Sequence, residues 1–181
     1  QSMNRHDSAA FYADSCLQLY NKLLDYNSLD LSSPKPFNQY NPEVIFETSV
    51  SDETDALMTT FARGCLVDSV LYGLYHTNDL RRDAFYSLPD AGLPYFKRSY
   101  IGSAFPFSGI AVDEMVLIRA ESCARAGNIP GAMKDLNALL VNRWKQQTFN
   151  PLTASSIPEA LQIVLEERRK ELPLRGLRWT D

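Results

Sequence analysis

The chain has 181 residues, of which 45% are hydrophobic and 22% are charged, and this composition excludes a chain that is disordered throughout. Its 18 basic and 22 acidic residues give a net charge of -4, so it lacks the basic excess with which proteins bind nucleic acid or anionic membrane surfaces. No apolar run reaches the roughly 18 residues that a membrane-spanning helix needs.

The cysteines and histidines predict neither a disulfide framework nor a metal site. The three cysteines, Cys16, Cys65 and Cys123, are odd in number and widely separated, so we expect free, buried thiols. The two histidines, His6 and His76, have no second histidine or cysteine at ligand spacing, which argues against zinc and haem. We therefore expect no metal and no cofactor.

The first part of the chain predicts one helix and one long connection. After Asp7-Ser8, which suits a helix N-cap, apolar residues recur at steps of three and four and predict an amphipathic helix over 8–26. Residues 27–42 are rich in serine, asparagine, aspartate and proline. This composition is typical of an exposed connection.

The middle of the chain predicts less regular structure. The run 44–50 contains β-branched and aromatic residues and predicts a short extended segment with Val44 and Phe46 on the same side. Helical spacing returns over 65–76. Between 84 and 110, glycines and prolines interrupt a series of aromatic residues, so we expect a long loop whose phenylalanines anchor it in the core.

A helical hairpin is the clearest element of the sequence. The first helix begins at Val112 and ends before Gly127, and the second covers about 130–142. Small residues, Ala120 and Ala132, would let the two helices approach closely, as in tetratricopeptide repeats. Any helical protein could contain such a hairpin, and a single one cannot bury both of its faces. The cover could come from the helix over 8–26 or from chain outside this sequence.

A third helix is predicted from Ser156, which has capping-box spacing to Glu159, as far as Leu172, where Pro173 ends it. The predicted fold class is therefore mainly α, with tetratricopeptide-like helical hairpins, long irregular loops and a short extended segment.

The charged residues 166–171 on this third helix do not indicate catalysis. Glu166 and Lys170 have the favourable i,i+4 order, so we interpret the run as a solvated or structural ion-pair face. Catalytic carboxylates would have to face each other across a substrate. The sequence also contains neither a nucleophile elbow nor a glycine-rich phosphate loop, so we predict that the protein is not an enzyme.

Four segments together resemble the RagB/SusD family of surface glycan-binding lipoproteins. They read NPEVIFE at 41–47, DLR at 79–81, VDEMVLIRAES at 112–122 with Gly127, Ala132 and Leu136-Asn137 after it, and IVLEERRKEL at 163–172 followed by GLRW at 176–179. The segments occur in the family's order. The resemblance implies a single SusD-like region over 1–181, of the C-terminal-half type and truncated at both ends.

The resemblance also implies a function. The protein would be a non-catalytic binding protein on the outer surface of the cell outer membrane, lipid-anchored in its full-length form. It would capture an oligosaccharide or another nutrient for a SusC-like TonB-dependent transporter. The alternative is a tetratricopeptide-like module that binds a partner protein.

Candidate ligand residues are aromatic, because flat rings stack on the C–H faces of sugars. We select Tyr86, Tyr95 and Tyr100 from the aromatic loop, and Trp144, which follows a predicted helix end. Trp179 lies inside a family motif, and we expect it in the core.

Overall fold

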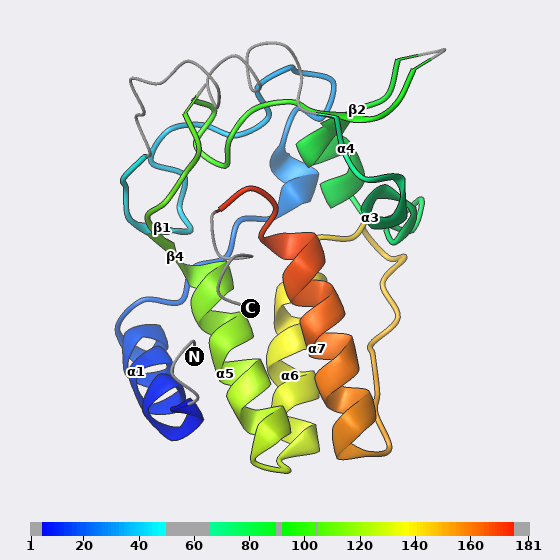
Figure 1. Cartoon of the computed structure of the whole chain (residues 1–181). Helices are drawn as coiled ribbons and strands as arrows, with labels where there is room; N and C mark the ends of the chain where they lie inside the picture. The colour runs from blue at the N-terminus through cyan, green and yellow to red at the C-terminus, as the bar shows by residue number, and fades with distance from the viewer. Residues whose placement is uncertain (1–4, 50–65, 90–91, 104, 176–181) are drawn as a thin grey trace.

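The structure is a computed structural model that describes residues 5–49, 66–89, 92–103 and 105–175. Four helices form one layer, and loops with short helices and strands form a second layer above their ends (Figure 1). The helical layer contains α1 (His6–Leu19), α5 (Val112–Arg125), α6 (Ile129–Leu140) and α7 (Ile157–Glu171). The upper layer contains the 3-10 helix η1 (Tyr26–Ser28), the short helices α3 (Ser69–Gly73) and α4 (Arg81–Phe85), and the strands β1 (Val44–Phe46), β2 (Tyr86–Ser87), β3 (Tyr95–Phe96) and β4 (Ile110–Ala111).

The predicted hairpin is confirmed as α5 and α6. Gly127 adopts a φ of 80°, a left-handed conformation that glycine accepts without strain, and this turns the chain between the two helices. The Asn128 side chain then caps α6 by accepting a hydrogen bond from the Gly131 N–H. Ala120 and Ala132 have no exposed surface and lie in the same core cluster, as close helix packing requires.

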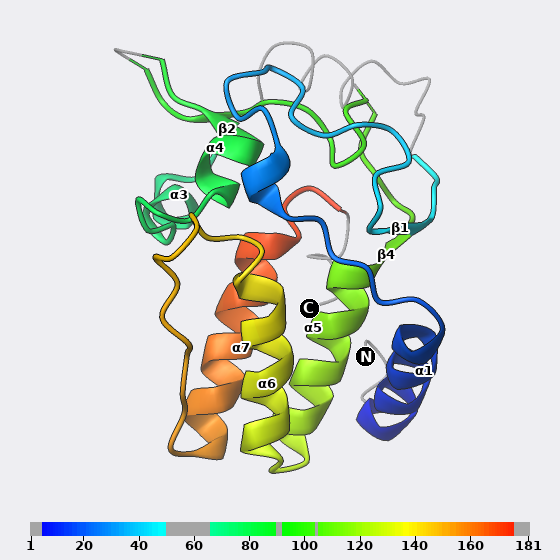
Figure 2. The ribbon, with the colours of Figure 1, turned by 180° about the vertical axis from the view of Figure 1, so that it is seen from behind.

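The third predicted helix is confirmed as α7. Ser156 caps it by accepting from the Glu159 N–H, but the Glu159 carboxylate accepts from Ser155, so the capping box forms only in part. The connection from α6 returns along the helices before α7 begins (Figure 2). Asn137 of α6 holds this connection through two hydrogen bonds to the Leu152 backbone.

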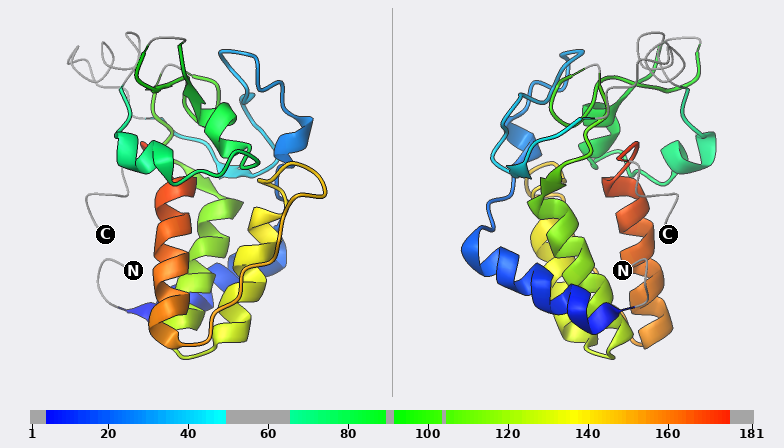
Figure 3. Two further views of the ribbon diagram at one scale, coloured as in Figure 1. Left: turned by 90° about the vertical axis from the view of Figure 1, so that its right-hand side faces the viewer. Right: turned by 60° about the vertical axis from the view of Figure 1, so that its left-hand side comes forward.

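The first helix is shorter than the predicted 8–26. It ends at Leu19, because tertiary partners take the backbone groups further on: Leu24 N–H donates to Glu43 at 2.9 Å, and Leu24 C=O accepts from Arg143 at 2.7 Å. Ala13 and Leu17 are its buried residues, and it lies across α5 (Figure 3). This helix therefore covers part of the α5–α6 hairpin, as one of the two predicted alternatives proposes.

The extended segment is also shorter than predicted. β1 pairs antiparallel with β4, and the register shifts between Val44 and Phe46. This register shift interrupts the predicted alternation, and the two residues differ in burial: Phe46 is 59% exposed, while Val44 packs against a cluster of buried aromatic residues that includes Tyr26 and Phe37. With one partner strand and an irregular register, no regular alternation develops.

The middle of the chain has a shorter first helix than the sequence predicts, but more regular structure after it. The helix predicted over 65–76 is reduced to α3, which Asp68 caps. The aperiodic stretch contains the end of α4 and a β2–β3 pair, followed later by β4. Three of its phenylalanines are buried as expected, whereas Phe105 is 36% exposed. The buried ones are Phe85, Phe96 and Phe107.

Two separate hydrophobic clusters form the core. One lies among the four long helices and consists of aliphatic residues. The other, the aromatic core, fills the upper layer and includes Tyr26, Phe37, Phe85 and Phe107. Cys16 and Cys123 are free thiols, as predicted, but they are half-buried rather than buried, and Cys65 lies outside the described residues.

Candidate functional site

The sequence motifs, although far apart in the chain, converge at the junction of the two layers. Each contributes charged residues to one cluster of side chains, which we call the ionic network. Every member is less than a tenth exposed. The members are Glu43, Asp79, Arg81, Asp113, Arg143, Glu167, Lys170, Glu171 and Arg175. The final motif segment, 176–179 with Trp179, lies outside the described residues.

Arg81 connects α4 to α7. Its guanidinium contacts Asp79 at 2.6 Å, Glu167 at 2.7 Å and Glu171 at 3.0 Å. Lys170 completes this part of the network through Glu167 at 2.6 Å. The charged run on α7 is thus a structural ion-pair face, as predicted, although it is largely buried and the expected Glu166–Lys170 pair is replaced by Lys170–Glu167.

Arg143 connects three parts of the chain. It donates to Glu171 at 2.7 Å and to Glu43 at 2.6 Å, and its guanidinium lies 4.2 Å from the centre of the Tyr26 ring. Arg143 belongs to none of the sequence motifs, because a single arginine after a helix end carries no pattern.

Arg175 and Asp113 form the third part of the network. The two guanidinium nitrogens of Arg175 meet the two carboxylate oxygens of Asp113 at 3.0 and 2.5 Å. The guanidinium also lies 3.9 Å from the centre of the Tyr100 ring, and the Tyr100 hydroxyl donates to Glu43. Arg175 was likewise missed by sequence analysis.

The network contains five carboxylates and four basic groups. Burial raises the pKa of Glu43 to about 7, and Asp113 and Glu171 add to the effect while Arg143 opposes it. Burial also disfavours ionisation of Asp79, but Arg81 and Lys170 outweigh it and lower the pKa of Asp79. Protonation of Glu43 would balance the remaining charges. The five carboxylates all accept hydrogen bonds from protein groups, so the network suits a structural role rather than catalysis.

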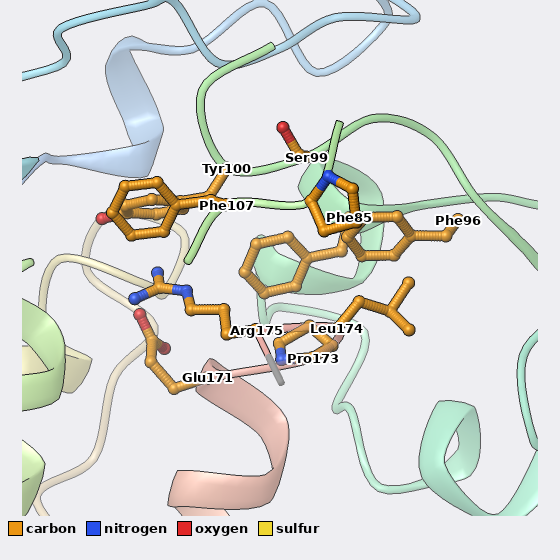
Figure 4. A pocket seen from close by; sticks show the side chains of 10 residues that line it. Phe85, Phe96, Ser99, Tyr100, Phe107, Glu171, Pro173, Leu174 and Arg175 are labelled. Atoms are coloured by element: carbon orange, nitrogen blue, oxygen red, sulfur yellow. The ribbon is translucent and has the colours of Figure 1, made fainter. Parts of the chain in front are cut away.

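A cavity beside the network is too small for a sugar. Its volume is about 10 Å³, close to the minimum for one water molecule. Figure 4 shows aromatic rings on one side and the ends of Glu171 and Arg175 on another. The lining residues are Phe85, Phe96, Ser99, Tyr100, Pro106, Phe107, Glu171, Pro173, Leu174 and Arg175.

A second hollow, of about 480 Å³, lies between the start of α1 and the end of α5. It is open and mostly polar, and it offers no tyrosine or tryptophan ring for stacking. Its lining residues are Arg5, His6, Asp7, Ser8, Ser122, Arg125 and Ala126.

The structure places the four predicted ligand residues in three different environments. Tyr86 and Tyr100 belong to the aromatic core and are 3% and 4% exposed. Tyr95 is half-buried on β3, opposite Ser87 of β2. Trp144 is half-buried against the helical core and stacks on His76, with ring centres 5.1 Å apart. That these residues contact a ligand stays a prediction.

Among the described residues, the most exposed aromatic rings lie elsewhere. Tyr40 is 75% exposed and Phe46 is 59% exposed in the segment around β1. Phe11 and Tyr12, at 67% and 71%, lie on the outer side of α1. None of them is among the ligand residues predicted from the sequence, because exposure depends on which elements cover a residue.

The described part of the chain has no group of histidine, cysteine, aspartate and glutamate side chains arranged to hold a metal ion. None of the helices described is both long and apolar enough to cross a membrane.

Comparison with known proteins relates the fold to solved structures. No protein-family model matches the sequence, and no curated protein matches it. A SusD-like carbohydrate binding protein from Bacteroides vulgatus shares 23% identity over 98% of this chain, with a TM-score of 0.69. A SusD superfamily protein from Bacteroides fragilis shares 16% identity over 96% of the chain, with a TM-score of 0.68. A further structure from Bacteroides vulgatus shares 20% identity over 94%, with a TM-score of 0.65.

The chain corresponds to only part of these proteins. It spans 41%, 46% and 41% of their lengths. The superposition nevertheless includes nearly all of this chain, both the helical layer and the upper layer. The chain therefore has the SusD-like fold, as its sequence motifs predict.

Proposed function

We propose that this chain takes part in non-catalytic oligosaccharide binding. The observation that carries the proposal is its structural match, at a TM-score of 0.69 over 98% of its length, to a SusD-like carbohydrate binding protein. Its surface chemistry is consistent with this: the net charge of -4 disfavours polyanions, and several aromatic rings are exposed. The buried carboxylates are engaged by arginines, which disfavours an enzyme.

The proposal extends to place and partner. The region 1–181 would form one SusD-like unit on the outer surface of the outer membrane, and it would deliver the sugar to a SusC-like TonB-dependent transporter. Two findings are compatible with this: the SusD-like fold and a helical layer separate from the aromatic core. Co-purification of the protein with a transporter encoded beside it would test the partnership. Failure to recover any complex from membranes would count against it.

Among the four predicted ligand residues, Tyr95 and Trp144 are the better candidates. They keep exposed surface, whereas Tyr86 and Tyr100 are enclosed by other rings. Replacing a buried tyrosine would disturb the core and confuse loss of folding with loss of binding.

Calorimetry with soluble oligosaccharides tests the binding function directly. We expect at least one of maltohexaose, cellohexaose, xylohexaose or mannohexaose to bind the wild-type chain, and Tyr95→Ala or Trp144→Ala to weaken that binding. If none binds under conditions where the protein is folded, the proposed function is wrong. If one binds and both variants retain full affinity, the ligand lies elsewhere on the protein.

A second candidate is a protein-interaction module. The outer side of α1 carries Phe11, Tyr12 and Leu19, which are 67%, 71% and 89% exposed, and exposed apolar patches often mark contacts with other proteins. Replacing Phe11 and Leu19 by serine should abolish co-purification with a partner and leave sugar binding unchanged. Retained co-purification would remove α1 from the interface.

A further inference from the structure

Tyr40 combines high exposure with a strained backbone. Its side chain is 75% exposed, and its φ is 55°, in the left-handed region that residues with a side chain rarely adopt. Among the described residues other than glycine, only Gln147 and Leu174 also have a positive φ. Such strain persists only where surrounding contacts impose it, and it is frequent at functional sites.

Two sets of hydrogen bonds impose the conformation of Tyr40. Glu47, just after β1, accepts from the Tyr40 N–H at 3.2 Å and from the Gln39 side chain at 2.7 Å. On the other side, the buried Asn41 donates to the Tyr100 backbone at 3.0 Å and accepts from the Glu43 N–H at 3.1 Å. The backbone under the exposed ring is therefore fixed, and Glu43 joins it to the ionic network.

The ring itself is open. Within the described residues, the Tyr40 ring makes no stacking or cation–π contact, whereas Tyr86 and Tyr100 are each surrounded by aromatic neighbours. Because the backbone of Tyr40 is already fixed, less conformational entropy is lost when a ligand stacks on the ring. Tyr40 thus provides what Tyr86 and Tyr100 lack, a flat apolar face that reaches solvent.

Polar groups suited to sugar hydroxyls lie beside the Tyr40 backbone. Glu47 uses both carboxylate oxygens to hold the turn, and each oxygen can accept a second hydrogen bond. Gln39 donates through its amide nitrogen and has an amide oxygen that can accept. A planar amide and a carboxylate next to an exposed tyrosine form a combination typical of sugar sites.

We propose that Tyr40 is a stacking platform for a pyranose ring, with Gln39 and Glu47 as hydrogen-bonding partners of its hydroxyls. This inference rests on the proposed function and adds to it the residues that contact the sugar. The class of ligand is a neutral oligosaccharide, because the adjacent Glu47 would repel an anionic one.

The experiment measures binding of the four hexasaccharides named above by saturation-transfer NMR and calorimetry. Tyr40→Gly removes the ring, and glycine accepts the φ of 55°. It should unfold at about the wild-type midpoint, because relief of the strain offsets the greater freedom of glycine in the unfolded chain. We expect about a tenfold or greater loss of affinity for the sugar that binds, and Tyr40→Phe to stay within about threefold of wild type.

The matched control is Tyr12→Ala. Tyr12 is 71% exposed, close to the 75% of Tyr40, but it lies on α1 at the other layer. We expect the control to bind the hexasaccharide with wild-type affinity. In saturation-transfer spectra, the sugar's ring protons should lose their signal with Tyr40→Gly and keep it with Tyr12→Ala.

The possible results separate the two proposals. If the wild-type chain binds none of the sugars, the proposed function fails and this inference fails with it. If the wild type binds and Tyr40→Gly binds equally well, only the role of Tyr40 is overturned. Equal losses in Tyr40→Gly and Tyr12→Ala, or a loss in Tyr40→Phe as large as in Tyr40→Gly, would also overturn it.

Discussion

Arg81 shows how much one buried side chain can depend on its partners. It has no exposed surface and contacts three carboxylates of the ionic network. Desolvation of an isolated guanidinium would be costly, so the ion pairs do not measure net stabilisation. The ion pairs determine how much stability is lost when one charged residue is removed, because its partners are then left buried without an opposite charge.

We expect Arg81→Met to destabilise the protein by about 3–5 kcal/mol, because it leaves Asp79, Glu167 and Glu171 short of a cation. Urea denaturation measures the change. The control is Arg169→Met on α7, whose pair with Asp68 is 3.3 Å long and partly exposed, and we expect it to cost less than about 1 kcal/mol. Similar losses in both variants would argue that the location of the charge does not matter.

Glu43 should make stability depend on pH. Its folded-state pKa of about 7 lies above the ordinary 4.5, so the folded protein binds the extra proton between these values. The stabilisation that this proton gives the folded state is therefore complete below about pH 4.5, and it is lost as the pH rises through about 7. Relative to Glu43→Gln, which cannot titrate, the wild type should lose about 3 kcal/mol over this range. Denaturation at a series of pH values checks this, and parallel curves for the two proteins would contradict it.

At the scale of elements, periodicity was a good guide where a helix packs on other helices. The boundaries of α5, α6 and α7 agree with prediction to within about two residues, because their apolar stripes face one shared core. The helix predicted from the sequence is longer than α1, because Leu23 and Leu24 continue its apolar stripe. In the structure, however, the Leu24 backbone forms hydrogen bonds with Glu43 and Arg143. Contacts over such separations leave no local signal.

The candidate site was predicted only in part, for a related reason. Motif residues such as Glu43 and Arg81 were found, but Arg143 and Arg175, which complete the network, have no pattern around them. From the sequence, ligand candidates can be chosen only by residue type, as aromatic residues. Whether a tyrosine is enclosed like Tyr100 or open like Tyr40 depends on the packing of the upper layer.

The turn between α5 and α6 makes an element-scale prediction. Gly127→Ala should destabilise the protein by about 1 kcal/mol, because alanine is strained at a φ of 80° although its Cβ would have room, 3.4 Å from Ile157. Gly73→Ala is the control: it ends α3, meets nothing within 4 Å, and should be neutral or stabilising. Thermal denaturation compares the two, and equal midpoints would show that the turn tolerates a side chain.

For the molecule as a whole, the ionic network joins the helical core to the aromatic core. We expect the helical layer and the upper layer to unfold together, because separating them would leave charges of the network partly buried without their partners. Far-ultraviolet circular dichroism follows the helices, and near-ultraviolet dichroism follows the packed tyrosines. Coincident transitions would support one cooperative unit, and an earlier near-ultraviolet transition would contradict it.

The order of the network's members along the chain also bears on synthesis. Glu171, which pairs with both Arg81 and Arg143, is translated 128 residues after Glu43. At roughly 5–20 residues per second, the ribosome takes about 6–25 s to cover this distance. Until α7 has emerged, the nascent upper layer cannot close without burying unpaired charge, so it has to stay hydrated and open. The last described helix thus sets the time at which the earlier half of the chain can fold.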